Sequence, residues 1–118
     1  MTRVPLPASF LALPLAHRAL HDRAHGRIEN SAQAVNAAVA AGYGIEVDLQ
    51  LSSDGVPMVF HDEALDRLTE ESGPINTRTA ADLGRIRLKG STDTIPTLAG
   101  VLKLIDGLGE RTYAYTCY

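Results

Sequence analysis

The stretch GIEVDLQLSSDGVPMVFHD, residues 44–62, predicts a strand, a tight turn and a second strand. Acidic or polar residues alternate with aliphatic ones through its first half, and this period of two places each kind on its own face of a strand. The polar face consists of Glu46, Asp48 and Gln50. Residues 52–55, SSDG, supply a turn, because Asp and Gly tolerate the backbone conformations of a tight reversal. The stretch therefore predicts a β-hairpin with carboxylates on one face.

The register of this hairpin decides which side chains meet. If Leu51 faces Val56, then His61 faces Glu46, and residues directly opposite each other lie about 4.5–5.5 Å apart. A register shifted by one residue places Asp62 opposite Glu46 instead. The two carboxylates of the polar face repel each other, and a bound cation relieves this repulsion. Oxygen ligands of this kind suit Mg²⁺ or Ca²⁺.

The length and composition indicate one domain that does not bind nucleic acid. The chain has 118 residues, 45% of them hydrophobic, and a net charge of −3, which argues against a nucleic-acid binder. The single Cys117 excludes an internal disulfide. Apolar residues 10–16 are too few to span a bilayer, and Arg3 alone does not make a signal sequence. We expect a soluble cytoplasmic protein without stable membrane insertion.

A helix is predicted in the alanine-rich segment that precedes the hairpin. Asn30 is a favoured N-cap residue, and Gln33 lies at the third helical position, as in a capping box. Val35 and Val39 are four residues apart, so they share the face that would pack on a sheet. Gly42 is a stop signal. The predicted helix therefore covers about residues 32–41.

This helix joins two predicted strands into a βαβ unit. Residues 11–16 form a short apolar run, and residues 44–51 follow the helix. Such units favour parallel strands with a right-handed crossover, so His17 and Arg18 fall on the same sheet edge as the end of the second strand. Alone, the polar face of the hairpin would fit the solvated side of a half-exposed strand. A His-Arg pair and a His-Asp pair at neighbouring strand ends favour a ligand site instead.

The second half of the chain has weaker patterns. Thr79 begins a short predicted helix. Thr97 is the predicted N-cap of a clearer one that ends at Gly107, and residues 112–118 form a last predicted strand. The apolar face of the clearer helix consists of Leu98, Val101, Leu102 and Ile105.

Short motifs in a fixed order connect the chain with a known family. They are His17-Arg18, Glu29-Asn30, Glu46-Val47-Asp48, Asp54-Gly55, His61-Asp62 and Ile95-Pro96-Thr97-Leu98. This order resembles the glycerophosphodiester phosphodiesterase family, and residues 63–69, EALDRLT, are similar to its continuation after His-Asp. Three departures stand out: Ala19 replaces a usual glycine, Ile28 replaces a usual proline, and the strand around residues 112–118 lacks the family's third acidic ligand.

The resemblance implies a fold. The family has the (β/α)₈ TIM barrel of the phospholipase C-like phosphodiesterase type, which needs about 250 residues. Residues 1–118 would be the N-terminal part of such a domain, an α/β partial barrel truncated after about the first three or four strands. Its open barrel edges would favour self-association.

The resemblance also implies a site. Glu46 and Asp48 would be ligands of a divalent cation, Mg²⁺ or Ca²⁺. His17 and His61 would be the general acid and base, and Arg18 would bind the substrate phosphate. The implied reaction of lipid metabolism is hydrolysis of a glycerophosphodiester to an alcohol and glycerol 3-phosphate. The alternatives are an inactive truncated fragment that binds metal or self-associates, and a metal-binding module without catalysis.

Other residues near these motifs have simpler interpretations. Glu29 fits either a negative charge at the start of the helix or support for the site. Asn30 is expected to be the N-cap of the helix, with support for the site as the alternative. Asp66 and Arg67 are expected to form a local ion pair.

Overall fold

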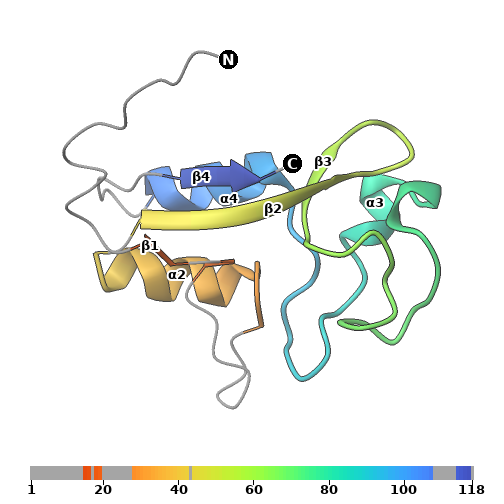
Figure 1. Ribbon diagram of the computed structural model, residues 1–118, viewed down its shortest axis with the longest axis horizontal. Helices are drawn as coiled ribbons and strands as arrows, with labels where there is room; N and C mark the ends of the chain where they lie inside the picture. Colours follow the sequence, from red (N-terminus) through yellow and green to blue (C-terminus); the bar gives the residue numbers. More distant parts are fainter. Residues whose placement is uncertain (1–14, 17, 20–27, 43, 108–113, 118) are drawn as a thin grey trace, which may run out of the picture.

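The fold is built around one central strand, β2. The computed structural model describes residues 15–16, 18–19, 28–42, 44–107 and 114–117 (Figure 1). The strands are β1 (Leu15–Ala16), β2 (Gly44–Leu51), β3 (Pro57–Val59) and β4 (Ala114–Cys117). β1 and β4 pair parallel with β2, which runs between them, and β3 pairs antiparallel with its second half. The parallel strands on both sides of β2 confirm the predicted βαβ pattern and the predicted last strand.

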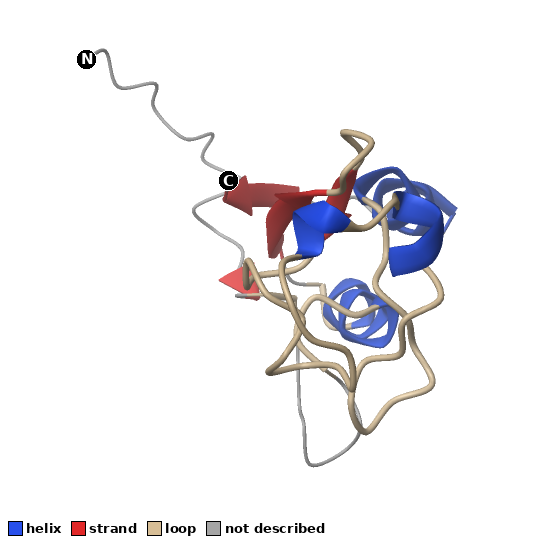
Figure 2. Ribbon diagram, turned by 90° about the vertical axis from the view of Figure 1, so that its right-hand side faces the viewer, coloured by secondary structure: helices blue, strands red, loops and turns tan. Residues whose placement is uncertain are grey.

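The longer helices cover one face of this sheet. They are α2 (Ala32–Ala40) and α4 (Leu98–Gly107), and Figure 2 shows them together on one side of the strands. The shorter helical turns are η2 (Ile75–Thr77) and α3 (Ala80–Leu83). Thr79 and Thr97 cap α3 and α4 as predicted, since their hydroxyls accept from the N–H groups of Asp82 and Gly100. The described part of the chain contains no helix of the length and apolarity that crossing a membrane requires.

The predicted cap of α2 is wrong by one residue. Ser31, not Asn30, precedes the helix with an extended backbone, and its Oγ accepts from the N–H of Ala34 at 3.1 Å. Asn30 instead has a φ of +58°, a left-handed conformation that Asn tolerates better than most residues. Ser and Asn are equally good N-cap residues, so the sequence alone does not decide which of two neighbours caps the helix. Ser31 therefore caps the helix, and the side chain of Asn30 hydrogen-bonds to Asp48 of β2 instead.

The hairpin adopts the shifted register. Leu51 pairs with Pro57, so the simple register in which Leu51 faces Val56 is wrong. The paired ladder of β3 ends at Val59, and neither His61 nor Asp62 pairs with Glu46. Beyond the ladder, the N–H of Phe60 donates to the Asp48 carbonyl at 2.9 Å, which keeps the segment before His61 next to β2.

The turn explains this register. The N–H of Ser52 donates to the carbonyl of Val56 at 3.0 Å, and the Ser52 hydroxyl accepts from the N–H of Val56 at 2.9 Å. Three residues are thus enclosed, and the last of them, Gly55, has a φ of +78°. A three-residue loop with glycine in the left-handed region is a common hairpin connection.

Apolar side chains fill the space between the sheet and the two long helices. Ile45 and Val47 point from β2 into this core, and Val35 and Val39 meet them from α2 as predicted. The predicted apolar face of α4 is correct except at Leu102, which is 48% exposed, while Leu104 packs against the core in its place. The other buried members are Ala19, Ala34, Ala38, Val59, Val101 and Ile105.

A second apolar cluster holds the long excursion between β3 and α4. Phe60 and Met58 begin this cluster at the end of the hairpin, and Ile28 joins it from the segment before α2. The remaining buried members are Leu65, Leu68, Ile75, Leu83, Ile86, Leu88 and Ile95. This packing fixes the segment that carries His61, Asp62 and Arg67 relative to β2.

The burial of apolar side chains predicts a clear difference between two aliphatic substitutions, one on β2 and one on α4. Ile45→Ala empties a fully buried position and should lower the free energy of unfolding by about 2–5 kcal/mol. Leu102→Ala removes a half-exposed side chain and should cost about 1 kcal/mol or less. Chemical denaturation of both variants beside the wild type measures this difference. Equal costs would contradict the assignment of the buried face.

Candidate active site

The carboxylates of β2 are buried on the face that points away from the helices. The residues Glu46 and Asp48 are only 7% and 9% exposed. They alternate with Ile45 and Val47, which face the helical layer. The interpretation of this face as the solvated side of a strand is therefore wrong. Buried carboxylates require hydrogen bonds or positive partners, and the surrounding residues supply them.

A tight backbone turn brings Arg18 to these carboxylates. Arg18 and Ala19 both have left-handed backbones, with φ of +53° and +60°. The N–H of Arg18 donates to Oε2 of Glu46 at 2.9 Å, and the N–H of Ala19 donates to the Glu46 carbonyl at 2.8 Å. A glycine at position 19 would adopt this conformation without the cost of about 1–2 kcal/mol that other residues incur. The buried Ala19 methyl packs in the core and offsets part of that cost.

The guanidinium of Arg18 has contacts on several sides. Its Nη1 donates to Oε2 of Glu29 at 3.1 Å, and its Nη2 lies 3.0 Å from Nε2 of His61. Its Nε lies 3.7 Å from Oδ2 of Asp48. This Nε is buried and has no hydrogen-bond partner among the described residues. One donor of the guanidinium thus remains available beside the carboxylates of β2.

Asn30 holds Asp48 from two directions. Its Nδ2 donates to Oδ2 of Asp48, and its Oδ1 accepts from the Asp48 N–H, both at 3.3 Å. The Asn30 N–H donates to the Arg18 carbonyl at 2.8 Å, which ties the arginine turn to the same residue. Asn30 therefore supports the site, and its predicted capping role belongs to Ser31.

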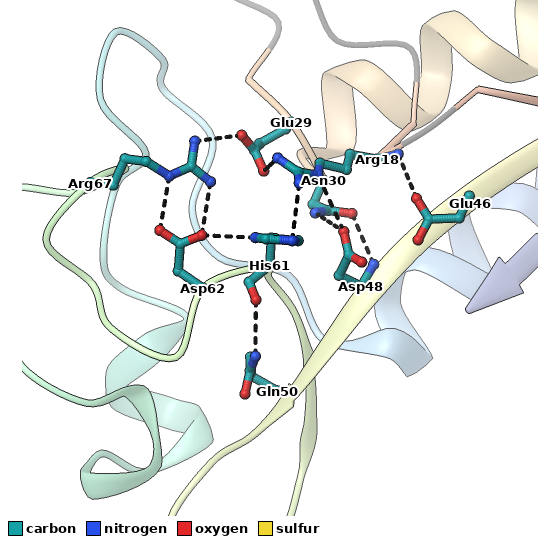
Figure 3. Close-up of polar contacts among 9 residues, drawn as sticks. All are labelled: Arg18, Glu29, Asn30, Glu46, Asp48, Gln50, His61, Asp62 and Arg67. Carbon is teal, nitrogen blue, oxygen red and sulfur yellow. Dashed lines mark hydrogen bonds and ion pairs between the residues drawn. The ribbon is translucent and has the colours of Figure 1, made fainter. Parts of the chain in front are cut away.

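His61 is oriented by the residue that follows it. Its Nδ1 lies 2.9 Å from Oδ1 of Asp62, and its Nε2 faces Arg18 (Figure 3). Because a guanidinium only donates, Nε2 must accept and Nδ1 must carry the proton. In the neutral ring, these contacts fit the Nδ1–H tautomer. Gln50 fixes the backbone of His61, since its Nε2 donates to the His61 carbonyl at 2.9 Å.

Arg67 is a site residue that sequence reasoning missed. It was expected to pair with Asp66, and this expectation is wrong, because Asp66 accepts from the N–H of Gly73. Arg67 instead binds both oxygens of Asp62, at 2.8 and 2.9 Å, and Oε1 of Glu29 at 2.8 Å. The resemblance of residues 63–69 to the family was the only signal that pointed to this segment.

These contacts close into a ring of side chains, which we call the polar ring. Its members are Arg18, Glu29, Arg67, Asp62 and His61. Glu29 lies between the two arginines, and this position favours support for the site over a role at the helix start. The polar ring lies beside Asp48 and Asn30 (Figure 3).

The ring shifts the pKa values of its acidic members. The hydrogen bond from Arg67 lowers the pKa of Asp62 to about 2, against the opposing effect of burial. Burial by itself raises the pKa of Glu29, but the hydrogen bond from Arg67 and the charges of Arg67 and Arg18 together outweigh it, so that pKa is lowered. The same partners raise the pKa of Arg67. Both acids are therefore ionised at neutral pH.

A cleft opens next to His61. It has a volume of about 500 Å³. Its lining includes Asp48 and Gln50 from β2, and His61, Glu63 and Asn76 from the excursion that follows the hairpin. The cleft gives a small molecule access to the imidazole from the side of Asp48.

The described residues supply part of the predicted site. They bring together Arg18, Glu46, Asp48 and His61, whereas His17 lies outside them. The donor set of Glu46 and Asp48 is two buried carboxylates, which fits a hard divalent cation that keeps several water ligands. No group of three or more metal-ligating side chains occurs among the described residues.

Comparison with solved structures defines the class of protein. A phosphodiesterase from Oleispira antarctica, solved in complex with the product sn-glycerol-3-phosphate, matches with a TM-score of 0.72 and 28% identity over 92% of this chain and 47% of that chain. The glycerophosphodiester phosphodiesterase from Agrobacterium tumefaciens matches with a TM-score of 0.76 and 28% identity, over 88% and 46%. The fold is thus part of a TIM barrel of this class of phosphodiesterase, with an open sheet.

The sequence comparisons give the family. The model of the glycerophosphoryl diester phosphodiesterase family matches residues 17–114, and the chain belongs to this family. Glycerophosphodiester phosphodiesterase 1 from Rattus norvegicus is 33% identical over 93 residues, which cover 71% of this chain and 27% of the relative. The glycerophosphodiester phosphodiesterase from Caldanaerobacter subterraneus is 36% identical over 84 residues, covering 65% and 35%. The chain therefore spans about a third or less of these relatives.

The lowered pKa of Asp62 predicts a specific acid sensitivity. The carboxylate stabilises the fold fully above its ordinary pKa of 3.8, and this contribution is lost as the pH falls from 3.8 to about 2. Asp62→Asn removes the titrating group, so the stability difference between wild type and variant should shrink between about pH 5 and pH 2. Chemical denaturation across this range measures it. Asp106→Asn, at an exposed position of α4, is the control. A constant difference for Asp62→Asn would contradict the assignment.

Proposed function

We propose that the chain carries the site of a metal-dependent glycerophosphodiester phosphodiesterase. The reaction is hydrolysis of a glycerophosphodiester to an alcohol and glycerol 3-phosphate. The observation that carries the proposal is the Arg18 guanidinium, which faces His61 and keeps a buried donor beside Asp48. A cationic side chain, an imidazole and paired carboxylates, close together beside a cleft that Asp48 and His61 line, are groups that phosphodiester hydrolysis can use. Membership of the family supports the same reaction.

Arg18 is the proposed phosphate-binding residue. A guanidinium binds two phosphate oxygens at once and keeps its charge at every accessible pH. The substrate phosphate would compete with His61 for Nη2 and would take the hydrogen bond that Nε lacks. Glu29 holds Nη1 from the opposite side, so the guanidinium keeps its orientation while its partners change.

His61 is a proposed general acid or base. Its Nε2 becomes free to accept a proton when Arg18 turns to the phosphate. The carboxylate of Asp62 then stabilises the imidazolium through Nδ1. His17 is the proposed second histidine, on the resemblance of the His17-Arg18 motif to the family. One histidine would protonate the leaving oxygen while the other removes a proton from the attacking group.

Glu46 and Asp48 are the proposed metal ligands. Their carboxylates would hold Mg²⁺ or Ca²⁺, and Asn30 keeps Asp48 in place. When bound, the cation would polarise a phosphoryl oxygen and offset the negative charge that develops at phosphorus.

The length of the chain favours a second candidate. Residues 1–118 would be the N-terminal part of the domain, since the relatives are two to four times as long as the matched region. The described residues also hold no third acidic ligand beside Glu46 and Asp48. The alternative is therefore an inactive part of the enzyme that binds metal or self-associates through open sheet edges. The cytoplasmic location and the role in lipid metabolism stay predictions.

Turnover by the 118-residue chain separates the two candidates. Glycerol 3-phosphate should be released from glycerophosphocholine in the presence of Mg²⁺ or Ca²⁺ and not in EDTA. Glu46→Gln and His61→Gln should each lower the rate about 10²–10⁴-fold, because each removes a group that acts on the reacting phosphate. Arg78→Met, which breaks an ion pair with Glu71 away from the cleft, should leave the rate unchanged. A folded chain without metal-dependent turnover would support the inactive alternative.

Metal binding has a readout that does not depend on turnover. Mg²⁺ or Ca²⁺ at 100 times its Kd should stabilise the fold by about 2.7 kcal/mol, which thermal unfolding detects as a higher midpoint. Glu46→Gln should abolish this shift, and His61→Gln should keep it. A metal-binding module without catalysis predicts the same shift with no turnover. A shift that survives Glu46→Gln would place the cation elsewhere.

A further inference from the structure

Arg67 joins Asp62 to Glu29, as Arg18 joins His61 to Glu29 on the other side of the polar ring. One end of its guanidinium holds Asp62, the partner of His61, and the other holds Glu29, the partner of Arg18. Arg67 itself makes no hydrogen bond to His61 or Arg18. Its side chain is 44% exposed, so solvent screens part of the energy of these ion pairs. Its position suggests that Arg67 fixes the orientation of Asp62 and Glu29, and through them of His61 and Arg18.

The first contact fixes the direction of a carboxylate. Arg67 binds Asp62 through Nε to Oδ2 at 2.8 Å and through Nη2 to Oδ1 at 2.9 Å. Such a two-point contact prevents the carboxylate from rotating. Oδ1 therefore stays directed at Nδ1 of His61, 2.9 Å away, and keeps the ring proton on that nitrogen. The unprotonated Nε2 is then held toward Arg18.

The second contact fixes a guanidinium through a shared acid. Glu29 is buried, and Arg67 binds its Oε1 at 2.8 Å while Arg18 binds its Oε2 at 3.1 Å. Rotation of the Glu29 carboxylate would break both bonds at once. The charge of Arg67 also lowers the pKa of Glu29, so the acid stays ionised between the two cations. Arg18 is thus held in place from the side opposite His61.

We propose that Arg67 is a positioning residue that sets the tautomer of His61 through Asp62 and the orientation of Arg18 through Glu29. The consequence for catalysis rests on the function proposed above, whereas the consequence for His61 does not. Arg78 is the natural contrast, because its Nη1 holds the single acid Glu71 at 2.8 Å outside the polar ring. Substitution of Arg67 should change the tautomer of His61, and substitution of Arg78 should not.

The tautomer of His61 tests the proposal without any substrate. Imidazole ¹⁵N chemical shifts, recorded at about pH 8 where an ordinary histidine is neutral, distinguish a protonated from an unprotonated nitrogen. The wild-type chain should show the Nδ1–H form. Arg67→Met should shift His61 to a mixture of both tautomers, and Arg78→Met should match the wild type. The signals of His61 among the four histidines are identified by their loss in His61→Gln.

Two further variants keep the test decisive. Arg67→Lys keeps the charge but cannot make the two-point contact, so it should also yield a mixture, and it serves if Arg67→Met does not fold. In an Asp62→Asn background, Arg67→Met should add little further change to the tautomer. Both substitutions act through the same contact, that between Asp62 Oδ1 and His61 Nδ1. An unchanged Nδ1–H form in both Arg67 variants would overturn the proposal, as would an equal change in Arg78→Met.

Activity gives an independent readout where turnover is present. Arg67→Met should lower kcat about 10–100-fold, as is usual for residues that orient a reacting group. A wild-type chain without turnover would contradict the proposed function and leave the tautomer comparison intact. A wild-type chain with turnover, and an Arg67→Met chain with the same kcat and the same tautomer, would overturn the positioning role alone.

Discussion

The burial of negative charge at one end of the sheet is the constraint on which the rest of the site depends. Glu29, Glu46 and Asp48 are all buried, and a buried carboxylate without a partner costs several kcal/mol. Arg18 meets this demand at three places, with its backbone N–H on Glu46 and its guanidinium near Glu29 and Asp48. The same buried negative charge would also favour the binding of a divalent cation, which is the basis of the proposed metal site.

The fold creates this arrangement because alternate residues of β2 face the helical layer and the site. Ile45 and Val47 anchor the strand in the helical layer, so the carboxylates between them must face the opposite side. The second apolar cluster then holds the excursion after β3, and with it His61 and Arg67, against the segment that carries Glu29. The left-handed turn at Arg18 completes the site at some cost in backbone strain.

Much of this could be predicted from the sequence, and the failures have local causes. The period of two on β2, the alanine-rich helix and the Thr97 cap are signals carried by neighbouring residues, and the structure confirms them. The cap at Ser31 was missed because Asn30 competes with it. The sequence left two hairpin registers open, and the three-residue loop that ends at Gly55 selects the shifted one. Arg67 could not be found this way, since its partner Glu29 is 38 residues away and only tertiary packing brings them together.

In the proposed function, Glu46, Asp48 and Arg18 form one site for a cation and a phosphate. A crystal structure of the chain soaked with Mn²⁺ and glycerol 3-phosphate tests it most directly, because anomalous scattering locates the metal independently of the protein. We expect a Mn²⁺ peak on the carboxylates of Glu46 and Asp48, with the phosphate on the Arg18 guanidinium and the His61 Nε2 released from it. A metal bound elsewhere, or a phosphate that leaves the Arg18–His61 contact intact, would show that these residues do not form such a site.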